Sequence, residues 1–131
     1  MAKLISVIGP HSRNTNNKVR IQWNMGNSCN YECEYCPPIL HDGSKNWFNK
    51  QVYIDTIERL NMHYRPLNKV LDYELIGGEV TVMPGFEDII RKIHENGSKS
   101  MIFTNGSRTI NWWSKAKLYL DTVVYTYHPL S

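Results

Sequence analysis

A chain of 131 residues, 41% of them hydrophobic, is long enough to build one domain core and too short for two. Its formal net charge of +3, from 15 Lys and Arg against 12 Asp and Glu, is spread along the chain without a basic run, so the charge gives no signal for nucleic-acid binding. No stretch approaches the roughly 18 consecutive apolar residues that a membrane helix needs, so we expect no membrane partner.

The N-terminal segment, residues 1–17, is predicted to be an extension that precedes the folded domain. It begins with a short apolar stretch that Ser6, Gly9 and Pro10 interrupt, which is too brief for the apolar region of a secretion signal. It ends in the polar sequence HSRNTNNK. The domain itself is therefore predicted to span residues 18–131.

The domain begins with a predicted strand that leads into a cluster of cysteines. In KVRIQWNM, residues 18–25, apolar and polar residues alternate strictly, which is the period-2 pattern of a strand with two unlike faces. The next segment, CNYECEYC, contains all 3 cysteines of the chain: Cys29, Cys33 and Cys36. An odd number of cysteines at such short spacing argues against a disulfide framework. It favours a reducing compartment, so we expect a cytoplasmic protein.

Predicted helices and strands alternate along the rest of the chain, because the apolar periodicity switches repeatedly between the helical and extended patterns. The first predicted helix has the apolar stripe Tyr53, Ile57, Leu60 and Tyr64, and Pro66 ends it. A buried strand over 70–77 follows, and then a second helix that starts from Pro84 and has Gly97 as its cap. The remaining predicted elements are a strand over 98–106, a short helix over 109–118 and a strand over 121–127. This alternation implies right-handed βαβ units. The predicted fold class is therefore α/β, with a parallel sheet and outer helices.

Polar or glycine-rich segments follow each of the predicted strands. The cysteines follow the first, GGE (77–79) the second, TNG (104–106) the third and YHP (127–129) the fourth. Ligand sites in parallel sheets gather at the carboxyl ends of the strands. We therefore expect these segments to converge on one rim.

The three thiols indicate metal chemistry at this rim. Three thiolates suit a metal centre that takes four ligands, and the missing fourth leaves a position for water, substrate or cofactor. The alternative is a zinc site completed by His41, five residues after Cys36, in a non-catalytic zinc- or cluster-binding module. Taken singly, GGE and TNG would be turns, and Glu79 would be a solvated loop carboxylate.

The cysteine spacing C-x3-C-x2-C after the first strand, together with LIGGEVT and IFTNGS at the next two strands, resembles the radical S-adenosylmethionine (SAM) superfamily. The resemblance covers roughly residues 18–131 and implies a partial, TIM-barrel-like (βα) barrel. It implies that Cys29, Cys33 and Cys36 bind three irons of a 4Fe-4S cluster, whose fourth iron SAM chelates. Reductive cleavage of SAM would then give a 5′-deoxyadenosyl radical that abstracts hydrogen from an unidentified substrate. A reducing partner such as a flavodoxin or ferredoxin would supply the electron.

The resemblance also implies which residues contact SAM. Tyr35 matches an aromatic residue beside the adenine, and Gly77 and Gly78 would let the backbone approach the ligand closely. Glu79 matches a position near the SAM amino group. The remaining residues that the family pattern suggests are Thr104 and Asn105 in a SAM-contacting segment, with Tyr127 and His128 as further candidates whose residue types have no family match.

Two features depart from the family pattern. Val80 stands where the family often has proline after Gly-Gly-Glu, which changes the stiffness of the loop. The family's usual core has six βα units, whereas this chain ends after the fourth predicted strand. We therefore expect either a truncated, inert remnant or a barrel that another chain or segment completes.

Overall fold

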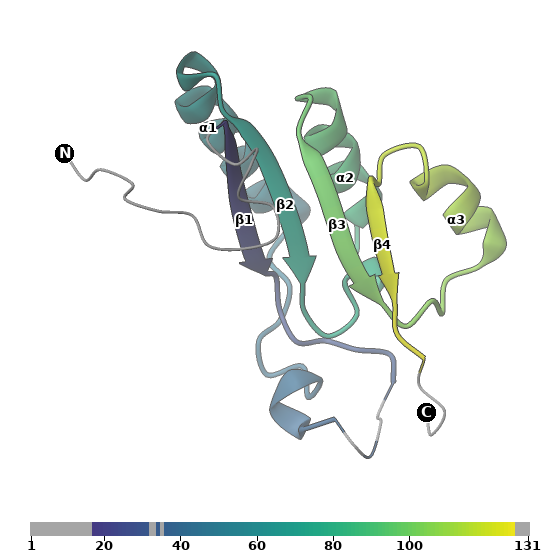
Figure 1. Ribbon diagram of the computed structural model, residues 1–131. Coiled ribbons are helices and arrows are strands. Elements are labelled where there is room, and N and C mark those ends of the chain that lie inside the picture. Colours follow the sequence, from purple (N-terminus) through teal and green to yellow (C-terminus); the bar gives the residue numbers. More distant parts are fainter. Residues whose placement is uncertain (1–16, 32–33, 35, 128–131) are drawn as a thin grey trace.

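The computed structural model describes residues 17–31, 34 and 36–127. In these residues, 4 strands form one sheet in the order β1-β2-β3-β4, and every neighbouring pair is parallel (Figure 1). The strands are β1 (Lys18–Asn24), β2 (Val70–Ile76), β3 (Lys99–Thr104) and β4 (Thr122–Tyr125). The predicted α/β class with a parallel sheet is confirmed.

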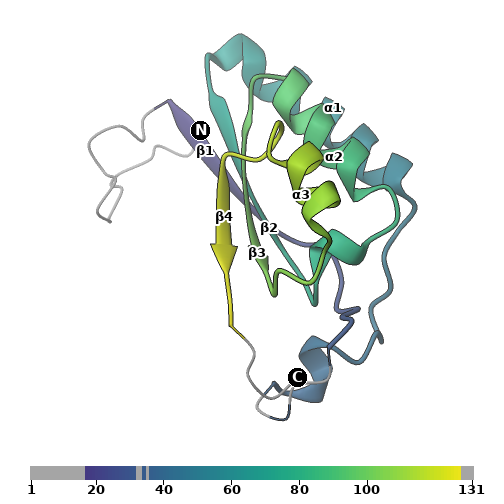
Figure 2. The ribbon, with the colours of Figure 1, turned by 90° about the vertical axis from the view of Figure 1, so that its right-hand side faces the viewer.

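A helix connects each strand to the next, and the helices all lie on the same face of the sheet (Figure 2). They are α1 (Lys50–Tyr64), α2 (Phe86–Glu95) and α3 (Ile110–Ala116), with short 3-10 turns η2 (Pro38–Leu40), η3 (Arg65–Leu67) and η4 (Val80–Val82) in the connections. Within the part of the chain that the structure describes, no helix combines the length and the apolar character of a membrane span.

Local sequence signals set the ends of these helices. The Asn49 side chain accepts a hydrogen bond from the backbone N–H of Gln51 at the start of α1, an N-terminal cap. Pro66 lies in η3, directly after α1, in agreement with the prediction that it ends that helix. After α2, Gly97 has a φ of +72°, the left-handed conformation that glycine supplies at helix ends.

The core lies between the helices and the sheet. The apolar residues Phe86, Ile89, Ile90 and Ile93 of α2 are each 0% exposed, so the predicted stripe is the buried face of the helix. Alternate residues of the strands point toward the same layer. The largest fully buried side chains there include Tyr53, Ile57, Tyr73, Leu75 and Ile102.

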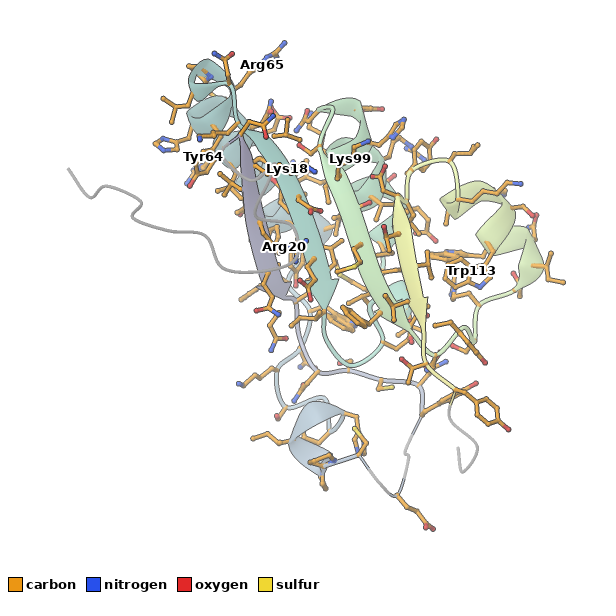
Figure 3. All side chains as sticks on the ribbon, viewed as in Figure 1. Lys18, Arg20, Tyr64, Arg65, Lys99 and Trp113 are labelled. Atoms are coloured by element: carbon orange, nitrogen blue, oxygen red, sulfur yellow. The ribbon has the colours of Figure 1, made fainter. Side chains whose placement is uncertain are left out.

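The face of the sheet opposite the helices is polar at the amino ends of the strands. Arg20, Asp72 and Lys99 lie side by side in register across three strands, and Figure 3 labels Arg20 and Lys99. An Arg20 Nη2 atom lies 3.4 Å from Asp72 Oδ2, which makes a half-exposed ion pair of small stabilising effect. Toward the carboxyl ends of β2 and β3 this face becomes apolar, with Ile76 and Phe103.

Two fully buried tyrosines should respond oppositely to removal of their hydroxyl groups. The Tyr53 hydroxyl donates to the Met25 carbonyl at 2.8 Å and accepts from the Phe48 N–H at 3.1 Å. The Tyr73 hydroxyl has no hydrogen-bond partner among the described residues, and burial raises its pKa. We expect Tyr53→Phe to lower the free energy of unfolding by about 1–2 kcal/mol, because it removes the donor to the buried Met25 carbonyl and the acceptor of the partly buried Phe48 N–H. Tyr73→Phe should leave that free energy unchanged or raise it by up to about 1 kcal/mol.

Urea denaturation of the two variants and the wild type measures both effects. The substitutions are chemically identical and both sites are closed to water, so each variant is the control for the other. Equal losses of stability in the two variants would contradict the assignment of the hydrogen bonds.

Candidate functional site

The carboxyl ends of the strands form one rim, and a long loop between β1 and α1 passes beneath it (Figure 1). We call the described residues of this loop that precede η2, 26–31 together with 34, 36 and 37, the cysteine loop. The loops after β2 and β3, residues 77–79 and 105–109, end at the same rim. The predicted convergence is thus found for these three segments, while all of the fourth, 127–129, except Tyr127 lies outside the described residues.

Asn27 holds the cysteine loop to the returning chain. Its side chain is 6% exposed, and its Nδ2 atom lies 2.8 Å from the Ile39 carbonyl, 2.8 Å from Asp42 Oδ1 and 3.0 Å from Ser44 Oγ. Its Oδ1 atom accepts from the Lys45 N–H at 2.8 Å. Hydrogen bonds from Ser44 lower the pKa of Asp42, which keeps an acceptor in front of Asn27. One buried amide therefore ties the start of the β1–α1 connection to residues 39–45 of the same connection.

The glycines after β2 bring two stretches of backbone into contact. The Gly78 N–H donates to the Gly26 carbonyl at 3.2 Å, and the Glu79 N–H donates to the Ser28 carbonyl at 2.9 Å. A Cβ atom on Gly78 would lie 2.2 Å from the Ser28 carbonyl oxygen. The two glycines therefore allow the backbone after β2 to pack directly against the backbone of the cysteine loop.

Glu79 joins the ends of β2 and β3. Its side chain is 1% exposed, so the alternative reading as a solvated loop carboxylate is wrong. Oε1 accepts from Thr81 Oγ1 at 2.6 Å and from Thr104 Oγ1 at 2.8 Å, and Oε2 accepts from the Asn105 N–H at 2.6 Å. Donors from η4, from the end of β3 and from the loop after β3 thus surround one buried carboxylate.

A ring of hydrogen bonds links the cysteine loop to the loop after β3. Asn105 Nδ2 donates to Asn30 Oδ1 at 3.0 Å, and Asn30 Nδ2 donates to Ser107 Oγ at 2.8 Å. The Ser107 N–H donates back to Asn105 Oδ1 at 3.0 Å. Neither Asn30 nor Ser107 was among the residues that the sequence predicted.

These loops surround a pocket of about 220 Å³ at the rim. Among the residues predicted from the sequence, the pocket is lined by Cys29, Cys36, Gly77, Gly78, Glu79, Thr104 and Asn105. Cys33, Tyr35 and His128 lie outside the described residues, so their predicted roles stay predictions. Tyr127 does not line the pocket and is 72% exposed.

Five further residues line the same pocket: Tyr31, His41, Ile76, Phe103 and Thr126. The sequence interpretation missed Thr126 because it extended the last strand to residue 127, whereas β4 ends at Tyr125. Successive residues of a strand face opposite sides of the sheet. Ile76 and Phe103 are therefore predictable as residues of the face opposite the helices once the helix-facing residues of β2 and β3 are known. For His41 the sequence suggests only the role of a zinc ligand.

The two described thiols have different polar neighbours. The Tyr31 N–H points at Cys29 Sγ, 3.5 Å away. His41 Nε2 lies 3.0 Å from the backbone carbonyl of Cys36 and donates a hydrogen bond to it. Within residues 17–31, 34 and 36–127, no group of three His, Cys, Asp or Glu side chains is arranged to hold a metal ion. Because Cys33 lies outside this set, the predicted three-thiolate centre remains a prediction.

No protein-family model, no curated protein and no solved structure matches this chain. The site is therefore interpreted from its own residues.

Proposed function

We propose that this chain is a radical SAM enzyme core that binds a 4Fe-4S cluster through Cys29, Cys33 and Cys36 and SAM at the adjacent rim. The observation that carries the proposal is the pocket, in which two thiols meet Gly77, Gly78 and Glu79 after β2 and Thr104 and Asn105 after β3. A zinc knuckle needs only its ligands. It has no use for the two additional rim segments.

The chemistry of the described donors fits an iron–sulfur cluster. Cys29 and Cys36 are half-buried and line one pocket, and cysteine thiolates are the usual ligands of such clusters. The N–H of Tyr31 points at Cys29 Sγ, and hydrogen bonds to cluster sulfurs help to set the reduction potential.

Glu79 has the capacity to accept a further donor. An ionised carboxylate offers about four lone-pair positions. Oε1 accepts from two hydroxyl groups, whereas Oε2 accepts only from the Asn105 N–H within the described residues. The ammonium group of SAM would complete Oε2, with Thr81 and Thr104 fixing the orientation of the carboxylate.

The protein residues would hold and orient the reactants, while the cofactors supply the difficult chemistry. When bound, the cluster would give one electron to the sulfonium of SAM, which breaks into methionine and a 5′-deoxyadenosyl radical that takes a hydrogen atom from the substrate. Because each cleavage consumes an electron, we include a one-electron donor such as a flavodoxin or ferredoxin as a partner. β4 is an edge of the sheet in the described residues, where strands of another chain or segment would extend a barrel.

Anaerobic reconstitution with iron and sulfide tests the proposal directly. We expect the dithionite-reduced wild type to give the EPR signal of a reduced 4Fe-4S cluster, with g values that change when SAM is added. Cys29→Ser and Cys36→Ser should each reduce the iron content severalfold, because each removes a thiolate ligand. Release of 5′-deoxyadenosine would establish turnover.

A zinc- or cluster-binding module without catalytic activity is the second candidate, because His41 lines the same pocket as the two thiols. His41→Ala separates a zinc site from a cluster site, and release of 5′-deoxyadenosine separates a cluster-binding module from an enzyme. A Cys₃His zinc site should lose its metal when His41 is replaced, whereas a cluster held by three thiolates should be retained. A wild type that binds zinc tightly and assembles no cluster would overturn the enzyme proposal.

A further inference from the structure

Two kinds of contact hold the cysteine loop at the rim. Toward β2, the contacts are backbone hydrogen bonds, from the Gly78 N–H to Gly26 and from the Glu79 N–H to Ser28. Toward β3, the contacts are the side-chain bonds of Asn30 to Asn105 and Ser107. The first kind needs only backbone atoms, whereas the second needs particular side chains, and on the cysteine loop that side chain is Asn30.

Asn30 uses both ends of its amide although the residue is exposed. Its oxygen accepts from Asn105 at 3.0 Å, its nitrogen donates to Ser107 at 2.8 Å, and the Ser107 N–H closes the ring on Asn105 at 3.0 Å. Each member of a closed ring both donates and accepts, so the bonds polarise one another. Loss of Asn30 opens the ring at two points.

The ring joins a neighbour of Cys29 to a residue that binds Glu79. Asn30 follows Cys29 in the chain, and the backbone N–H of Asn105 binds Oε2 of Glu79 at 2.6 Å. A displacement of the cysteine loop therefore reaches Asn105 through Asn30, and Asn105 shares the carboxylate proposed to receive the SAM ammonium.

From this geometry we infer that Asn30 is a positioning residue, which locks the cysteine loop to residues 105–107 and so couples cluster binding to SAM binding. The inference rests on the proposed function, since it concerns the distance between a cluster held at Cys29 and SAM held at the rim. Asn30 itself contacts neither cofactor in this scheme.

The test compares SAM binding at equal cluster content in the wild type and in Asn30→Ala, Ser107→Ala and the double variant. All three thiols remain, so we expect Asn30→Ala to assemble the cluster and to bind SAM about tenfold more weakly, the effect of losing two net hydrogen bonds. Ser107→Ala removes one acceptor and should weaken SAM binding about threefold. The double variant should bind SAM no more weakly than Asn30→Ala, because both changes open the same ring. EPR titration of the reduced cluster with SAM gives the affinities.

Asn46→Ala is the matched control, since Asn46 is an exposed asparagine of the same β1–α1 connection that does not line this pocket. It should bind SAM as the wild type does. SAM affinity of Asn30→Ala within twofold of the wild type, at full cluster content, would overturn the inference.

Hydrogen exchange in the protein without cluster provides a second, independent readout. Asn30→Ala should accelerate exchange of the Ser107 amide, which the ring protects, and leave the Val52 amide in α1 unchanged. Unchanged exchange at Ser107 would overturn the inference even if the variant failed to assemble a cluster. If the wild type assembles no cluster, the proposed function fails, while the exchange measurement still decides whether the ring locks the loop.

Discussion

Glu79→Ala should lower the free energy of unfolding by at least about 3 kcal/mol, because several buried donors lose their acceptor at once. The hydroxyl groups of Thr81 and Thr104 and the N–H of Asn105 all donate to this carboxylate, at 2.6, 2.8 and 2.6 Å. Both side chains are buried, since Glu79 is 1% exposed and Thr104 3%. We expect the substitution to separate the ends of β2 and β3. Chemical denaturation measures the loss of unfolding free energy.

Two further variants make this prediction decisive. Glu79→Gln keeps the shape and one acceptor oxygen, so it should lose roughly half as much stability and stay folded if the alanine variant does not. Glu74→Ala changes a glutamate within β2, on the face opposite the helices, where the effect should be within about 0.5 kcal/mol. Similar losses at positions 74 and 79 would show that the carboxylate at 79 is not a structural acceptor.

Gly78→Ala should displace the cysteine loop and cost about 3 kcal/mol of unfolding free energy, the upper range for overpacking. The added Cβ would lie 2.2 Å from the Ser28 oxygen, 2.5 Å from the Ser28 carbonyl carbon and 2.9 Å from the Asn27 carbonyl carbon. All three are backbone atoms, so no side-chain rotation relieves the clash. Because Ser28 precedes Cys29, the same variant should assemble much less cluster under the proposed function. Denaturation and iron analysis measure the two effects separately.

Gly97→Ala separates crowding from backbone strain. Gly97 has a φ of +72°, yet a Cβ there would meet nothing within 4 Å. Only the left-handed conformation is penalised, at about 1 kcal/mol. A Gly78 variant no more destabilised than the Gly97 variant would contradict the close packing of loop and strand end.

Elements with strong local periodicity were predictable from the sequence. The alternation of residues 18–25 gave β1, and the isoleucines of α2 gave its buried face, because burial of one side imposes a period on the chain. The position of the site was predictable because ligands of parallel sheets bind at the carboxyl ends of the strands, and only those ends have to be located in the sequence. At β4, where the strand ends two residues earlier than predicted, the sequence offers Tyr127 as a candidate, whereas Thr126 is the residue that lines the pocket.

The contacts within the site were less predictable because they join residues far apart in sequence. Glu79 meets Thr104 and Asn105 only after β2 and β3 pair, and no local pattern marks a threonine as its donor. The same holds for Asn30, whose partners belong to the loop after β3. The Gly-Gly pair did signal a close approach, although what approaches in the described residues is backbone from the cysteine loop.

The amide of Asn27 has a consequence for how a metal centre would form. By binding residues on the far side of the cysteine loop, including Lys45 and Asp42, it closes that loop without a covalent bond. Closing a flexible segment carries an entropic penalty that grows with the logarithm of its length. In this protein the penalty falls on folding, so under the proposed function iron would meet a loop whose ends are already held together.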